Sequence, residues 1–160
     1  GDGLIWGILR EKFPHLRYIG FDLKPKSGRL KIDSARMLAV APLQYDIIDI
    51  DTYGEPWRHY LAAAKSLRAP ATVFLTSGNG AGMLSNTSNL LKDVLNIPAN
   101  APQVLAHKVT KECTRILLHT PRKYDIITTD ITAVSIGDTV TYYGMRLTPQ
   151  RQGAHHVTDL

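Results

Sequence analysis

Helical and β-type segments alternate along most of the chain, and this alternation constrains the fold more than any other feature. Apolar residues recur at helical spacing over 4–13, the pattern ends at Pro14, and β-type residues follow over 17–22. Strands that alternate with helices imply βα units on a mostly parallel sheet. We therefore predict a doubly wound α/β domain.

The later segments continue the alternation. The expected elements are, in order, a short strand at 30–33, a helix over 34–40, a strand over 45–51, an Ala-rich helix over 56–67, a strand over 71–76 closed by a turn at 77–80, and helices around 89–95 and over 100–117. Residues 131–136 and 139–147 flank a Gly137-Asp138 turn and predict an antiparallel hairpin. The expected sheet is thus mostly parallel with a C-terminal antiparallel hairpin.

Length and composition exclude several classes of protein. The 160 residues fit one domain, which we expect over 1–149, followed by a polar tail over 150–160. No apolar run approaches the roughly 18 residues of a membrane span and no secretory pattern is present, so we expect no membrane partner and a cytoplasmic location. The single cysteine, Cys113, and the absence of metal-ligand spacing among the six histidines predict no metal site.

The chain is basic, with 19 Lys and Arg against 14 Asp and Glu and a formal net charge of +5. Two groups of basic residues stand out, one in a loop after the first strand and one on a face of the helix over 100–117: Lys24, Lys26 and Arg29, and Lys108, Lys111 and Arg115. They form either a surface that attracts a polyanion such as RNA or DNA, or an ordinary solvated surface. Charge alone does not decide between these readings.

Ligands of open α/β sheets bind beyond the carboxyl ends of the strands, which directs attention to two places near the N-terminus. Gly1, Asp2 and Gly3 precede a helix, where glycines let the backbone approach a ligand or where the turn simply caps the helix. Asp22 ends the following strand about 20 residues later, at a position suited to binding two ribose hydroxyls. The alternative for Asp22 is a surface acid that closes a strand.

Three further acids follow the later strands. Asp33 and Ser34 can accept a hydrogen bond from an adenine amino group, or cap the helix that follows. Asp49 and Asp51 end an apolar strand, where desolvation of a carboxylate is costly unless the group has a role. Tyr53 offers a ring on which a planar group can stack, or packs in its loop.

In this order, the segments resemble class I S-adenosylmethionine-dependent methyltransferases. The likeness rests on residues 1–3, Asp22, the Ile-Asp-Ser-Ala-Arg-Met-Leu segment at 32–38, the Tyr-Asp-Ile-Ile-Asp-Ile-Asp-Thr-Tyr-Gly-Glu-Pro segment at 45–56 and the Thr-Tyr-Tyr-Gly segment at 141–144. Within that family, the segments at 33–38 and 49–56 most resemble tRNA guanine N2-dimethyltransferases, whose loop reads Asp-x-Asp-Pro-Phe-Gly-Ser-Pro. The resemblance implies a Rossmann-like fold and S-adenosylmethionine as cofactor.

The resemblance also implies roles for individual residues. Gly1, Asp2 and Gly3 would line the methionine end of the cofactor, Asp22 its ribose, and Asp33 with Ser34 its adenine. Asp49, Asp51 and Tyr53 would face the transferred methyl group and the substrate, with Asp51 orienting an exocyclic amine and helping to remove its proton. The sequence departs from the family loop at Thr52 and Glu55, which stand in place of proline and serine.

Several alternatives stay open at this point. The substrate can be an amine of a nucleic-acid base, a small molecule or a protein, and the chain can also be a non-catalytic cofactor- or nucleic-acid-binding module. A dinucleotide-dependent oxidoreductase is disfavoured because the glycine turn lacks a complete Gly-x-Gly-x-x-Gly pattern. The family's first strand precedes the glycine loop, so we also expect a strand before Gly1. Oligomeric state is not predicted.

Overall fold

The structure is a computed structural model that describes residues 4–22, 30–40, 42, 44–52, 56–78, 114–137 and 140–150. Its N-terminal part begins with helix α1, Leu4–Lys12. Strands β1, Phe21–Asp22, and β2, Leu30–Lys31, then pair in parallel. Helix α2, Ser34–Val40, follows with the bounds that the sequence predicts. The expected strand over 17–22 is shorter, because only its last two residues have a pairing partner.

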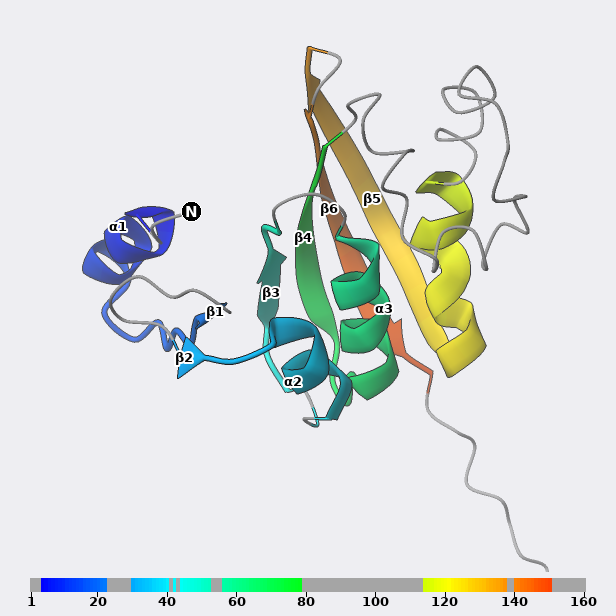
Figure 1. The fold of residues 1–160 in the computed structure, drawn as a ribbon, viewed down its shortest axis with the longest axis horizontal. Coiled ribbons are helices and arrows are strands. Elements are labelled where there is room, and N and C mark those ends of the chain that lie inside the picture. Colours follow the sequence, from blue (N-terminus) through cyan, green and yellow to red (C-terminus); the bar gives the residue numbers. More distant parts are fainter. Residues whose placement is uncertain are drawn as a thin grey trace, which may run out of the picture.

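A second, four-stranded sheet forms the body of the protein (Figure 1). It contains β3, Ile47–Ile50, β4, Ala71–Gly78, β5, Ile126–Ile136, and β6, Val140–Pro149, in the order β3-β4-β6-β5. The β3 and β4 strands run parallel, whereas β6 is antiparallel to both of its neighbours. The α/β class and the C-terminal hairpin are confirmed, while parallel pairing among the described strands is limited to β1 with β2 and β3 with β4.

Two predicted boundaries in this sheet are wrong. Ser77 and Gly78 were expected in a turn, but they extend β4 and pair with Thr141 and Val140 of β6. The hairpin strand β5 begins at Ile126, five residues before the expected start at Ile131. In both places, pairing with the long β6 strand overrides the local turn preference of small and polar residues.

Helices cover one face of this sheet. Helix α3, Trp57–Ser66, packs against α2, and a helical segment at 114–119 continues into the 3₁₀ helix η2, Thr120–Tyr124 (Figure 1). Ala63 and Ala64 have no exposed surface, since their small side chains let α3 approach the strands closely. Of the helix expected over 100–117, only the last turn lies among the described residues. Its apolar spacing predicts that Ile116 and Leu117 face the core; Leu117 is buried, but Ile116 is exposed.

The buried core joins α3 to the central strands. Its largest members with almost no exposed surface include Tyr60, Leu67, Leu75, Leu117 and Leu147. The Tyr60 hydroxyl donates to the Leu118 carbonyl oxygen at 2.8 Å, and burial raises the pKa of this hydroxyl. No helix in the described part of the chain is long and apolar enough to cross a membrane.

Candidate functional site

Asp49 stands on the face of β3 that points away from α3. Ile48 and Ile50 are buried on the α3 side, so the pleat of the strand exposes Asp49 on the other side. There its Oδ2 accepts a hydrogen bond of 2.8 Å from Nε1 of Trp6 in α1. The Trp6 ring is stacked on Tyr18, with 5.4 Å between ring centroids. These contacts place α1, the helix that follows residues 1–3, beside the end of β3.

An apolar pocket of about 320 Å³ lies between α1 and the sheet. Leu9 and Phe13 line it from the α1 side, Ile47 and Phe74 line it from the sheet, and the Asp49 carboxylate lies in its wall. The two sheet residues are 43% and 45% exposed, which shows that α1 covers this face only in part. The pocket therefore separates α1 from a sheet face that is not fully packed.

Asp33 caps helix α2. Its Oδ1 accepts a hydrogen bond from the backbone N–H of Arg36 at 3.1 Å, and its carbonyl oxygen accepts the first helical bond from Met37. This cap and the charge of Arg58 hold the pKa of Asp33 below its ordinary value. The capping role expected from the sequence is thus present. Because a carboxylate has two oxygens, the cap leaves Asp33 able to accept a further hydrogen bond.

Ser34, the first residue of α2, contacts His59 in the first turn of α3. Ser34 Oγ lies 2.9 Å from His59 Nε2, in a partly buried position. Burial and the neighbouring charge of Arg58 lower the pKa of His59, and Asp33 opposes that shift only in part. The imidazole is therefore neutral at pH 7. The contact ties the start of α2 to the start of α3.

The backbone of Asp22 contacts the segment that leads into Asp33. It pairs with Lys31 in the two-stranded sheet, and its carbonyl oxygen accepts a hydrogen bond from the Ile32 N–H at 3.0 Å. Ile32 directly precedes Asp33, so the carboxyl ends of β1 and β2 lie side by side. Asp22 and Asp33 therefore belong to neighbouring strand ends, as parallel pairing requires.

The loop that follows β3 begins at the protein surface and ends in the buried core. Asp51 is exposed, and Pro56 and Trp57, which begin α3, are buried. The Trp57 ring lies 6.2 Å from the ring of Tyr143 in β6. Thr52 Oγ1 is buried and has no hydrogen-bond partner among the described residues. The chain thus leaves β3 through Asp51 and returns into the core at Trp57, near His59.

Of the site residues predicted from the sequence, the structure brings Asp22 together with the segment at 33–34, and it places Ser34 and Asp49 against different helices. Asp22 lies beside the residue before Asp33, Ser34 lies against α3, and Asp49 lies against α1. Gly1, Asp2, Gly3 and Tyr53 lie outside the described residues. Trp6 and His59 are site residues that sequence reasoning missed. No local pattern marks either residue, because their partners are 43 and 25 positions away.

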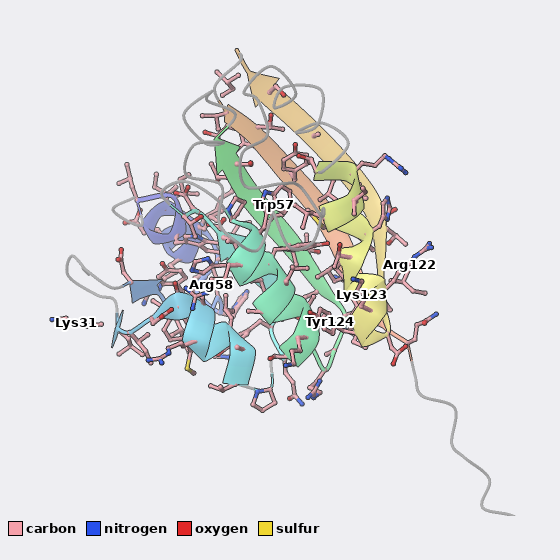
Figure 2. All side chains as sticks on the ribbon, turned by 45° about the vertical axis from the view of Figure 1, so that its right-hand side comes forward. Lys31, Trp57, Arg58, Arg122, Lys123 and Tyr124 are labelled. Carbon is pink, nitrogen blue, oxygen red and sulfur yellow. The ribbon has the colours of Figure 1, made fainter. Side chains whose placement is uncertain are left out.

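Basic residues that the structure describes lie in more than one place. Lys31 and Arg58 lie on the α2 side of the body, whereas Arg122 and Lys123 lie at η2 (Figure 2). Lys24, Lys26, Arg29, Lys108 and Lys111 lie outside the described residues. Within the described ranges, no group of three His, Cys, Asp or Glu side chains is arranged to hold a metal ion.

Comparison with known proteins reveals a similar fold. No family model matches the chain, and no curated protein matches it. Among solved structures, the chain is similar to Trm1 from Pyrococcus horikoshii in complex with S-adenosyl-L-methionine, with a TM-score of 0.53 and 21% identity over 74% of this chain. A LepI variant in complex with SAH and a substrate analogue matches with a TM-score of 0.43 and 14% identity over 94% of this chain.

These similarities concern the fold. The chain spans 32% of the Trm1 chain and 41% of the LepI chain. The fold of this chain thus resembles part of the fold of Trm1, at low sequence identity.

Proposed function

We propose that this chain is an S-adenosylmethionine-dependent methyltransferase domain that transfers a methyl group to an amine of a nucleic-acid base. The observation that carries the proposal is that Asp22 and Asp33 lie at the adjacent carboxyl ends of the paired strands β1 and β2. Asp22 adjoins the backbone of Ile32, Asp33 begins α2, and Ser34 connects α2 to the helix that follows the Asp51 loop. The similarity of the fold to Trm1 supports the same reading.

The acids suit the hydrogen-bond donors of this cofactor. A ribose presents two hydroxyl donors and an adenine presents an amino group, and carboxylates accept from both. In the proposal, Asp22 binds the ribose, Asp33 and Ser34 bind the adenine, and Gly1, Asp2 and Gly3 surround the methionine end. Asp49 lies beside the methyl group. S-adenosylmethionine supplies an electrophilic sulfonium methyl.

In the proposed reaction, Asp51 positions the acceptor amine. Its carboxylate accepts a hydrogen bond from the N–H, which aims the nitrogen lone pair at the methyl carbon and draws away the proton that the nitrogen loses. A new N–C bond forms as the S–C bond breaks, and the sulfur keeps the electron pair. Tyr53 stacks on the base. The Thr52 hydroxyl, buried beside Asp51, offers a further hydrogen bond to a polar substrate atom.

The domain organisation is part of the proposal. We propose a single domain over 1–149. In the described sheet, β3 pairs with β4 alone, and Ile47 at this edge is 43% exposed. An open edge of this kind can pair with a further strand.

Calorimetric titration with S-adenosylmethionine and S-adenosylhomocysteine tests the function. We expect binding by the unaltered chain, loss of binding in Asp22→Ala, and near-normal binding without methyl transfer in Asp51→Ala. Asp46→Ala is the matched control, because Asp46 is an exposed acid just before β3. No binding by folded protein contradicts the cofactor, and equal loss of binding in both test variants contradicts the division of roles.

Transfer of a labelled methyl group identifies the substrate class. RNA and DNA are the first acceptors to test, and binding to either should weaken steeply as salt increases, because basic residues contact phosphates. Labelling of proteins or small molecules with no labelling of nucleic acid would contradict the proposed substrate. Cofactor binding with no transfer to any of these acceptors would favour a non-catalytic module.

A further inference from the structure

His59 lies beside the proposed adenine-binding residues, and the proposed function gives it no role. It belongs to the first turn of α3, whereas Asp33 and Ser34 begin α2. The 2.9 Å contact between Ser34 Oγ and His59 Nε2 is the side-chain hydrogen bond that joins these two helix starts. Arg58, the preceding residue on α3, acts electrostatically on both Asp33 and His59 (Figure 2).

We propose that His59 is a positioning residue that acts through Ser34 to hold Asp33 where it binds the adenine amino group. This inference rests on the proposed function. Asp33 and Ser34 share one peptide unit, so fixing the Ser34 side chain restricts the backbone that carries the Asp33 carboxylate. The Arg36 N–H fixes one oxygen of that carboxylate from the other side. Together the two hydrogen bonds orient Asp33 before a ligand binds.

The alternative for a serine–histidine contact is a nucleophile activated by a base. Such a base is normally oriented by a third group that hydrogen-bonds its other ring nitrogen. His59 Nδ1 is buried and has no hydrogen-bond partner among the described residues. Asp33, the acid that acts electrostatically on the ring, accepts a hydrogen bond from the Arg36 N–H. The geometry therefore favours a positioning role over nucleophilic catalysis.

The neutral imidazole suits this role. A neutral ring has one nitrogen that accepts and one that donates, so Nε2 can pair with the Ser34 hydroxyl in either tautomer. The charged groups that act on the ring are Arg58 from α3, which disfavours a second positive charge, and Asp33 from the start of α2, which favours it. Protonation would place a charge in a half-buried site and leave two ring N–H groups to satisfy.

Selectivity for the adenine amino group tests the proposal. The two probes are S-adenosylhomocysteine and an analogue that carries unsubstituted purine in place of adenine. We expect the unaltered chain to bind the adenine form about tenfold more tightly. The purine form lacks the amino group, and loss of one hydrogen bond to a carboxylate weakens binding by about that factor. In His59→Ala and in Ser34→Ala this ratio should fall toward one. His59→Gln should restore most of it, since an amide can still pair with Ser34.

His15→Ala is the control, because His15 is an exposed histidine remote in sequence from these helices. A binding ratio that stays near tenfold in folded His59→Ala overturns the positioning role while leaving the proposed function intact. A binding ratio near one in the unaltered chain also overturns the positioning role and leaves the proposed function intact. No binding of either probe by the unaltered chain overturns the proposed function and this inference together. Ester hydrolysis that disappears in both Ser34→Ala and His59→Ala would overturn it in favour of a nucleophile.

If His59→Ala fails to fold, Ser34→Ala and His59→Gln keep the test open. Ser34→Ala removes the same hydrogen bond from a smaller side chain, and Ala is a good helix former at the start of α2. A ratio that remains near tenfold in folded Ser34→Ala overturns the proposal. A ratio that falls in His59→Leu, which cannot pair with Ser34, and is preserved in His59→Gln supports it.

Discussion

Helices α1 and α3 have similar lengths, nine and ten residues, and both carry apolar residues at helical spacing, yet they pack very differently. Helix α3 buries six residues against the sheet and its neighbours, whereas α1 buries none. Leu4 and Ile5 of α1 are 72% and 73% exposed. Amphipathic spacing therefore selects the helix, but the surface opposite decides how much stability its apolar face contributes.

The same contrast holds for the polar contacts of the two regions. In the body, the Tyr60 hydroxyl reaches the Leu118 carbonyl oxygen in the dry core. At the N-terminal side, the Trp6 indole reaches the Asp49 carboxylate in an exposed position. Water can replace the exposed donor but not the buried one, so the first contact should matter to global stability and the second to local order.

Matched truncations of apolar side chains should give the largest difference between the two regions. Leu75→Ala removes a side chain that is 1% exposed in β4, and we expect it to lower the free energy of unfolding by about 2–5 kcal/mol. Ile5→Ala in α1 should change it by less than about 0.5 kcal/mol. Urea unfolding measures both. A similar cost for the two variants would mean that Ile5 of α1 is packed as tightly as Leu75 in the core.

Removing the buried hydroxyl should have the next largest effect. Tyr60→Phe leaves the Leu118 carbonyl oxygen without this donor in the core, and we expect a loss of about 1–3 kcal/mol. Tyr142→Phe is the control, because Tyr142 of β6 is 46% exposed and should lose little. Thermal unfolding of both variants checks the difference. An unchanged midpoint for Tyr60→Phe would rule out this contact as a stabilising one.

Removing the exposed indole donor should have the smallest effect on the whole molecule. Trp6→Phe keeps an aromatic ring to stack on Tyr18 but loses the hydrogen bond to Asp49, and we expect at most about 1 kcal/mol of destabilisation. The change should appear as faster amide exchange in α1, with a smaller shift of the unfolding midpoint than in Tyr60→Phe. Unchanged exchange in α1 would show that this contact does not hold the helix.

Much of the local structure was predictable from the sequence. The helix over 34–40 has the expected bounds, and the helix expected over 56–67 differs from α3 by one residue at each end. The β strand expected over 45–51 forms its central four residues. The expected cap at Asp33 is also present. These features depend on residues within a few positions of one another, so local periodicity and capping preferences determine them.

The wrong and missing predictions concern contacts between residues that lie far apart in the sequence. The turn expected at 77–80 gave way to pairing of Ser77 and Gly78 with β6. The expected roles of Asp22, Asp33, Ser34, Asp49 and Asp51 stay predictions. The sequence marks His59 only as a histidine without metal-ligand spacing, and its contact with Ser34 could not be foreseen from either residue alone.

The sequence by itself determined the alternation of helices and strands, the C-terminal hairpin, and the acids that follow the strands, because each depends on local spacing along the chain. The tertiary structure alone decided which apolar faces are buried and that α2 begins against α3 through Ser34 and His59. Burial and side-chain contacts require a partner surface, and such surfaces are assembled from segments that lie far apart in sequence.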